Sequence, residues 1–310
     1  MEMRVIRSPW IFMVSIRPQI SIIMPTYMRA EIIGRAIKSV IGQTYHNWEL
    51  IIVDNFSKDN TEEVVLNFND KRIRFCKVHN HGIIAISRNK GIRLAYGEWI
   101  SFLDSDDWWD PDKLQICSEH MNHKVDVIYH DLKLVRDKSS WNNRVIRGKQ
   151  LNKPVISDLL LSGNVIPNSS IIVRKYHFLK VGMINESLDM VGSEDYDTWL
   201  KLSTVTDGFI YINKELGYYY DHDSAVSKKN MSHSGRAVIK QYLQVLSVQD
   251  RSKVMSVFSY LDGRYLYTNK DFSGAIVQLK YSVRYGSFFN KIKSIYTILI
   301  SVVKMMVKPN

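Results

Sequence analysis

Five aspartates lie within nine residues of one another in the stretch FLDSDDWWDPD. Carboxylates this close repel one another and raise each other's pKa unless a positive charge lies among them. A divalent cation such as Mg²⁺ or Mn²⁺, held by carboxylates and by phosphate oxygens, would supply that charge. We predict Asp104 and Asp106 as its ligands, because residues two apart share one face of a strand and a strand-like run ends just before them. For Asp110 and Asp112 we favour the alternative of a helix N-cap cluster around Pro111.

A second acidic group opens the stretch SEDYDTWLKL. A hydroxyl is a poor nucleophile at neutral pH, and a positioned carboxylate can accept its proton as it attacks. Glu194 and Asp195 are therefore candidates for acid–base chemistry. The alternative is ordinary helix chemistry, with Ser193 as the N-cap and acidic residues in the first turn.

Short β-branched runs alternate with helical periodicity in the first half of the chain, which indicates a parallel sheet with crossover helices. Ligands of such sheets bind beyond the carboxyl ends of the strands, and three of the strands end in MPTY, VDN and LDSDD. No G-x-G-x-x-G follows the first strand, which argues against a dinucleotide site. Strands are predicted at 20–25, 49–54, 73–78 and 99–104, and helices near 32–41, 60–68, 84–96 and after Pro111.

Four motifs in this order and spacing resemble the family 2 glycosyltransferases with the GT-A fold: SIIMPTYMR, WELIIVDNFSKDNT, ISRNKGIRLAYGEWISFLDSDDWWDP and SEDYDTWLKL. The resemblance covers residues 19–225 and implies an α/β, Rossmann-like GT-A domain with a mainly parallel sheet. It also implies a UDP-sugar donor and Mn²⁺ or Mg²⁺ as cofactor. Two departures lie near the nucleotide: Met28 stands where the family usually has asparagine, and DNFS stands where it often has D-D-G-S.

The resemblance assigns donor-binding roles to residues near the strand ends. Asp54 matches an acid that hydrogen-bonds uracil, and Arg88 matches an arginine near the base and the diphosphate. Asp104 should reach the ribose or the metal, and Asp106 should ligate the metal that bridges the two phosphates. The alternative for Tyr27 is a core aromatic residue, and for Asp54 a strand-end turn former. The remaining predicted donor residues are Pro25, Thr26 and Tyr27, for the base and ribose, and Ser105.

The same resemblance assigns catalysis to the second acidic group. Asp195 matches the catalytic base, and Glu194 would orient the acceptor or its loop. His222, in YYYDHDSAVS, lies where a histidine often approaches the metal or the phosphate oxygens. The alternative for His222 is a structural role.

The net charge of +11 comes from the C-terminal part, where 14 Lys and Arg face 3 Asp and Glu from Ser224 onward. We predict a basic helical region at 226–310 after the catalytic domain at 19–225, and an N-terminal extension at 1–18 without a signal-peptide core. The segment near 287–308 is apolar with a narrow polar stripe. Its longest uncharged run is ten residues, about half of the ~20 that a spanning helix needs. This segment is expected either to lie in an anionic membrane interface or to dock on the body.

The resulting prediction is an inverting, metal-dependent glycosyltransferase that moves a hexose or N-acetylhexosamine from a UDP-sugar to a sugar hydroxyl. The expected acceptor is a lipid-diphosphate-linked saccharide in O-antigen or capsule synthesis. The expected location is the cytoplasm, peripherally on the inner face of the cytoplasmic membrane. Cys76 and Cys117 have no metal-ligand spacing and fit a reduced compartment.

Two other classes of protein remain open on the sequence. A nucleotidyltransferase usually begins with a glycine- and basic-rich phosphate loop, which IIMPTYMRAE lacks. A nucleic-acid-binding module would explain the charge, but the basic region has no zinc-ligand or RNP-like pattern, so no nucleic acid is expected as a partner.

Overall fold

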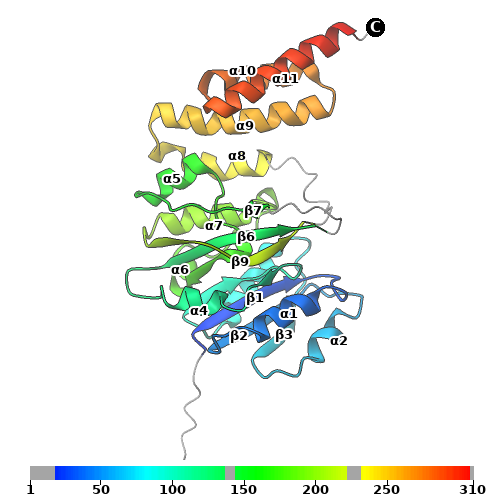
Figure 1. Cartoon of the computed structure of the whole chain (residues 1–310), viewed down its shortest axis with the longest axis vertical. Helices are drawn as coiled ribbons and strands as arrows, with labels where there is room; N and C mark the ends of the chain where they lie inside the picture. Colours follow the sequence, from blue (N-terminus) through cyan, green and yellow to red (C-terminus); the bar gives the residue numbers. More distant parts are fainter. Residues whose placement is uncertain (1–17, 137–143, 222–231, 308–310) are drawn as a thin grey trace, which may run out of the picture.

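The computed structural model describes residues 18–136, 144–221 and 232–307, and a mixed β-sheet runs through its centre (Figure 1). Among the described residues the strand order is β3-β2-β1-β4-β8-β6-β9-β5, with β7 paired to β6. The four strands predicted in the first half of the chain are all present, and they pair with one another in parallel. They are β1 (Ile20–Thr26), β2 (Trp48–Asp54), β3 (Ile73–Lys77) and β4 (Trp99–Phe102).

The second half of the chain extends the same sheet with mixed pairing. The strand β8 is antiparallel both to β4 and to β6, while β6 and β9 are parallel to each other. These later strands are β5 (Trp108–Trp109), β6 (Val127–Val135), β7 (Val145–Ile146), β8 (Ile172–Arg174) and β9 (Phe209–Tyr220).

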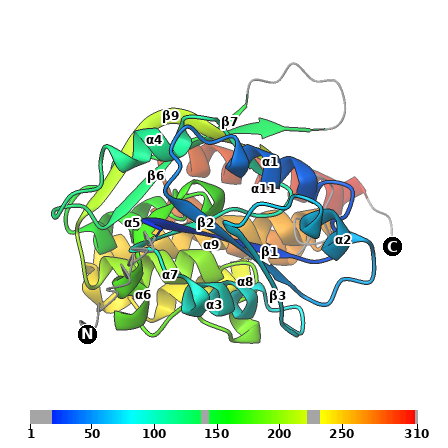
Figure 2. The ribbon, with the colours of Figure 1, turned by 90° about the horizontal axis from the view of Figure 1, so that it is seen from below.

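Helices cover both faces of the sheet, which leaves its central strands buried on both sides (Figure 2). Along β1, Ile22 and Met24 join the core under one set of helices, and Ile23 joins the core under the other. This is why the strand reads as a continuous apolar run rather than an alternating one. The first set is α1 (Ile33–Ile41), α2 (Thr61–Leu66) and α4 (Lys113–Ser118), and the second is α3 (Ile84–Leu94), α5 (Val155–Ser162), α6 (Lys175–Lys180) and α7 (Glu194–Ser203).

The C-terminal region is helical, as predicted, and begins with a helix that belongs to the body. Val238 and Ile239 of α8 are fully buried in the core that also contains α7. The layer formed by α9, α10 and α11 lies at the end of the molecule opposite α1 and α2 (Figure 1). The bounds are α8 (Ser232–Lys240), α9 (Val248–Thr268), α10 (Phe272–Tyr285) and α11 (Phe288–Val307), with short 3₁₀ helices at η1 (Asn168–Ser170), η2 (Leu188–Met190) and η3 (Leu243–Val245).

Several predictions made from the sequence fall outside the described residues. They are the extension at 1–18, of which only the last residue is described, and the domain boundary at 225/226. Within the described ranges, no helix combines the length and apolar character needed to cross a bilayer. Cys76 and Cys117 are both free thiols.

The contact between α3 and β1 provides a test of the fold. A Cβ added at Gly91 would lie 2.5 Å from Cγ2 of Ile23, a fully buried side chain on β1. We expect Gly91→Ala to lower the free energy of unfolding by about 1–3 kcal/mol, measured by urea denaturation, because the overpacked strand cannot move away. Gly34→Ala is the matched control, since the nearest atom to its added Cβ is 3.9 Å away. It should be neutral or stabilising by up to ~1 kcal/mol, and equal effects of the two substitutions would contradict the close packing.

Candidate active site

The carboxyl ends of β1, β2 and β4 bring the predicted donor residues to one rim of the sheet. Thr26 and Asp54 are the last residues of neighbouring strands and are paired in register. Asp104 follows β4 by two residues. The Oγ1 atom of Thr26 is buried without a hydrogen-bond partner among the described residues, whereas the side chain of Tyr27 is half exposed.

Asp54 connects the turns that follow β1 and β2. It is fully buried, and its two carboxylate oxygens accept hydrogen bonds from the backbone N–H (2.9 Å) and the hydroxyl of Ser57. The Ser57 Oγ atom in turn accepts a hydrogen bond from the backbone N–H of Met28 at 2.8 Å. Through Ser57, Asp54 therefore ties the turn after β2 to the turn after β1.

Both departures from the family pattern lie at backbone positions with positive φ. Met28 has a φ of 55° and Phe56 a φ of 52°, a region that asparagine and glycine adopt more easily than other residues. The side chains of both residues make local contacts in these conformations. The backbone N–H of Lys58 donates to the Met28 sulfur at 3.4 Å, and the Phe56 ring stacks on that of His79 with centroids 3.8 Å apart.

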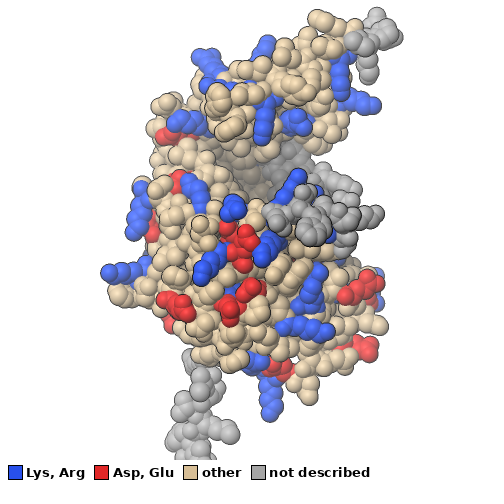
Figure 3. Space-filling model, viewed as in Figure 1, with Lys and Arg blue, Asp and Glu red and all other residues tan. Residues whose placement is uncertain are grey.

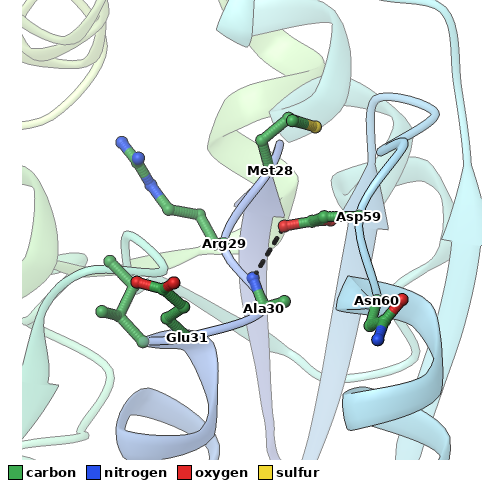
Figure 4. A pocket seen from close by; sticks show the side chains of 7 residues that line it. Met28, Arg29, Ala30, Glu31, Asp59 and Asn60 are labelled. Atoms are coloured by element: carbon green, nitrogen blue, oxygen red, sulfur yellow. Dashed lines mark hydrogen bonds between the residues drawn. The ribbon is translucent and has the colours of Figure 1, made fainter.

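An open pocket of about 540 Å³ lies between the β1–α1 loop and the start of α2 (Figure 4). The Ala30 backbone N–H donates to Asp59 at 3.0 Å and joins the two walls. The Arg29 side chain extends away from Asp59 (Figure 4), and its Nη2 atom lies 3.7 Å from a carboxylate oxygen of Asp106. The lining residues are Met28, Arg29, Ala30, Glu31, Ile32, Asp59 and Asn60.

The Arg88 guanidinium is the positive charge between the two acidic groups. Its Nη2 atom donates to Asp104 at 2.9 Å and its Nη1 atom donates to Glu194 at 2.8 Å. Burial alone would lower the pKa of Arg88, but the charges of Asp104 and Glu194 raise it above its ordinary value, so the group stays charged. Arg88 was predicted to lie near the base and the diphosphate, and here its two terminal nitrogens point at carboxylates.

The acidic loop after β4 contains one aspartate to which the sequence assigned no role. Asp107 is buried and accepts hydrogen bonds from the Ser169 hydroxyl (2.5 Å) and from the backbone N–H of Tyr220 (3.0 Å). Burial, and then the nearby charges of Asp104 and Asp106, raise the pKa of Asp107 well above its ordinary value.

The other aspartates of this loop differ in their surroundings. The side chains of Asp104 and Asp106 are 27% and 19% exposed, so solvent reaches both. Asp112 is the N-cap residue of α4, but its side chain makes no capping hydrogen bond. Below the loop, the buried Lys113 donates to the Ser101 hydroxyl of β4 at 2.8 Å and anchors the start of α4.

The start of α7 places Asp195 next to this cluster. Its Oδ2 atom accepts a hydrogen bond from the Asn164 side chain at 2.9 Å. Burial and then the charge of Glu194 raise the pKa of Asp195 to about 6, although Asn164 and Arg88 act in the opposite direction. Asn164 belongs to a loop without a recognisable motif, so it could not be predicted from the sequence. A carboxylate with this pKa is a competent proton acceptor near neutral pH.

Glu194 holds the start of α7 in position through two hydrogen bonds. One of its oxygens accepts the Arg88 hydrogen bond, and the other accepts the backbone N–H of Gly192 at 2.8 Å. It therefore fixes the start of α7 to α3 and β4. His222, the third predicted metal ligand, lies outside the described residues, and among the described residues no three His, Cys, Asp or Glu side chains form a group that could hold a metal.

Comparison with known proteins gives the family. The model of Glycosyl transferase family 2 matches residues 21–182, more than half of the chain, so the chain belongs to glycosyl transferase family 2. It is 33% identical over 200 residues to the Escherichia coli UDP-Glc:alpha-D-GlcNAc-diphosphoundecaprenol beta-1,3-glucosyltransferase WfgD, covering 62% of this chain and 74% of that one. It is 41% identical over 194 residues to the putative colanic acid biosynthesis glycosyl transferase WcaA of E. coli K12, covering 60% and 66%.

Other relatives are longer than this chain. It is 34% identical over 229 residues to an uncharacterized glycosyltransferase of Rickettsia felis, covering 70% of this chain but only 36% of that protein. Two solved structures share the fold, which confirms the predicted GT-A α/β architecture. S. aureus TarS in complex with UDP-GlcNAc has a TM-score of 0.64 at 18% identity, covering 90% and 89%. The Pyrobaculum calidifontis mannosyltransferase PcManGT in complex with GDP-Man and Mn²⁺ has a TM-score of 0.60 at 15% identity, covering 92% and 81%.

The role of Arg88 can be tested by its effect on stability at two pH values. Arg88→Gln leaves the buried Glu194 and the partly exposed Asp104 without their counter-charge, and we expect a loss of about 3–5 kcal/mol in the free energy of unfolding at pH 7.5. The loss should be smaller at pH 5, because protonation relieves an unpaired buried carboxylate.

Arg93→Gln is the matched control on the same helix. Its partner Glu186 is 3.8 Å away and both side chains are exposed, so the cost should stay under ~1 kcal/mol. If Arg88→Gln lowers the free energy of unfolding no more than Arg93→Gln, or by an amount that does not change with pH, the ion pairs of Arg88 with Asp104 and Glu194 do not have the proposed role.

Proposed function

We propose that this chain transfers a hexose or N-acetylhexosamine from a UDP-sugar to a sugar hydroxyl, with inversion at the anomeric carbon. The observation that supports this most is the Arg88 bridge, which holds the start of α7, and with it Asp195, beside the acidic loop after β4. Membership of the glycosyl transferase family favours this activity over the nucleotidyltransferase alternative.

The donor would bind along the rim formed by β1, β2 and β4. Thr26 offers a buried hydroxyl that no described group satisfies, and Tyr27 offers an exposed ring beside it. The relatives support a uridine nucleotide, since WfgD is named for UDP-Glc and TarS was solved with UDP-GlcNAc. Arg88 would act as a positioning residue, because both of its terminal nitrogens are engaged by Asp104 and Glu194.

The chemical step would be a single displacement. The acceptor hydroxyl oxygen attacks the anomeric carbon, its proton passes to the Asp195 carboxylate, and the bond from the anomeric carbon to the diphosphate oxygen breaks with its electron pair leaving on UDP. Asn164 would hold the Asp195 carboxylate in place through its hydrogen bond. No covalent intermediate on the protein is required.

Mn²⁺ or Mg²⁺ fits the acidic loop. Asp104 and Asp106 are reachable from solvent, and their charges add to the effect of burial in raising the pKa of the neighbouring Asp107, so a divalent cation would offset the repulsion among these carboxylates. Two carboxylates suffice when phosphate oxygens and water supply the other ligands. The bound cation would stabilise the charge that develops on the leaving diphosphate.

The proposed acceptor is a saccharide linked through diphosphate to a membrane lipid, used in O-antigen or capsule synthesis. The names of WfgD, with its diphosphoundecaprenol acceptor, and WcaA, with colanic acid, support this class. Such an acceptor would be met at the inner face of the cytoplasmic membrane.

The base is tested by substitution and by pH. Asp195→Asn keeps the shape and removes the proton acceptor, so we expect near-intact UDP binding with kcat lower by roughly 10²-fold or more. In the unaltered protein, kcat/KM should rise as the pH increases through about 6 and then level off, because the ionised form of Asp195 is the active one. Equal losses of UDP affinity and rate would instead mark Asp195 as a structural helix-start residue.

The cation site is tested by Asp106→Ala. We expect loss of turnover and of the metal-dependent increase in Tm that UDP produces, because cation and diphosphate stabilise each other's binding. Asp112→Ala removes an exposed carboxylate six residues further on and should retain both properties. Wild-type turnover of Asp106→Ala in excess EDTA would refute the assignment.

A further inference from the structure

The outward face of α11 is apolar along its whole length. Ile292, Tyr296, Leu299 and Val303 follow one another at spacings of four, three and four residues, and so share one side of the helix. The exposed fractions of Tyr296, Leu299 and Val303 are 64%, 60% and 57%. Phe288, Phe289, Ile295 and Met306 are also exposed and widen the patch.

The opposite side of α11 is polar and is turned inward. Ser294, Thr297 and Ser301 are buried, where the helix packs on α10 and meets α9. The Arg264 side chain of α9 donates to the Thr297 hydroxyl at 3.4 Å, and the Ser301 hydroxyl donates to the Thr297 carbonyl at 2.7 Å. The polar stripe seen in the sequence is thus largely the side of α11 that packs on the neighbouring helices. An ordinary amphipathic helix packs its apolar side on the protein and exposes its polar side.

Positive charge surrounds this apolar patch. Residues 272–310 contain six Lys and Arg and no Asp or Glu. Lys293 and Lys304 of α11 are exposed. Figure 3 shows blue side chains standing around tan surface on these helices at the upper end of the molecule.

We propose that the apolar face of α11, with the lysines beside it, docks the protein onto the anionic surface of a lipid bilayer. A contiguous apolar patch of this kind is uncommon on a free protein surface and marks an interaction site. Anionic headgroups complement the flanking lysines, whereas a second copy of this chain would bring lysines against lysines. The helix lies in the interface with its apolar side among the acyl chains. The inference rests on the proposed function only in one respect, namely that docking would bring the enzyme to a lipid-linked acceptor.

Vesicle flotation tests this docking with the full chain. The protein should float with vesicles of phosphatidylcholine containing phosphatidylglycerol, and poorly with phosphatidylcholine alone, and added salt should weaken the association without abolishing it. Leu299→Glu combined with Tyr296→Glu should reduce the bound-to-free ratio by about ten-fold or more, because each places a charge among acyl chains. Lys291→Gln with Lys293→Gln should reduce it by about five-fold per lysine on anionic vesicles only.

Leu66→Glu is the matched control, because Leu66 of α2 is 61% exposed at the other end of the molecule. It should bind vesicles as the unaltered protein does. Unchanged binding of the Leu299/Tyr296 variant, or equal binding of the unaltered protein to neutral and anionic vesicles, would overturn the proposal. A third result would also overturn the proposal: the unaltered protein is a dimer in light scattering and does not bind vesicles, and the Leu299/Tyr296 variant is a monomer.

The same samples separate the docking from the catalytic proposal. UDP release with a water-soluble acceptor should be equal in the Leu299/Tyr296 variant and the unaltered protein, since α11 lies far along the chain from every proposed catalytic residue. A protein that floats with anionic vesicles but releases no UDP would retain the docking and refute the proposed function.

Discussion

The structure depends most on the buried guanidinium of Arg88 and its two carboxylate partners. Asp104 lies 16 residues away in sequence and Glu194 lies 106 residues away, so one side chain of α3 joins the loop after β4 to the start of α7. Removing these charges from water is costly, and the pairs compensate each other only when the geometry is kept. The rim where a donor would bind and the helix that carries the base candidate therefore cannot shift independently.

The backbone around the nucleotide rim shows a second constraint. Met28 and Phe56 occupy left-handed conformations in which a β-carbon costs roughly 1–2 kcal/mol. The Phe56 ring stacks on His79, and the Met28 sulfur accepts a hydrogen bond from the backbone N–H of Lys58. The side chains at the two departures from the family pattern thus each make a local contact that holds its turn.

Local patterns were sufficient to predict the four strands of the first half, their crossover helices and the rim, because burial on both faces forces continuous β-branched runs such as that of β1. They were not sufficient for contacts made across long separations. Asp107 receives its hydrogen bonds from residues 62 and 113 positions away, and Asn164 reaches Asp195 from a loop with no periodicity. The orientation of α11 could not be predicted from the sequence either. Periodicity locates the polar and apolar sides of this helix, but the contacts with α9 and α10 determine which side packs against the protein.

The antiparallel insertion of β8 has a consequence for the emerging polypeptide. The neighbour of β4 at the sheet centre is a three-residue strand that begins about 70 residues later in the chain. At ~5–20 residues per second, the ribosome needs roughly 4–14 s to supply it. During that interval β4 presents an unpaired apolar edge to the surroundings, of the kind that pairs with foreign strands. This edge of β4 is therefore exposed during synthesis, and it is covered when residues 172–174 pair with it.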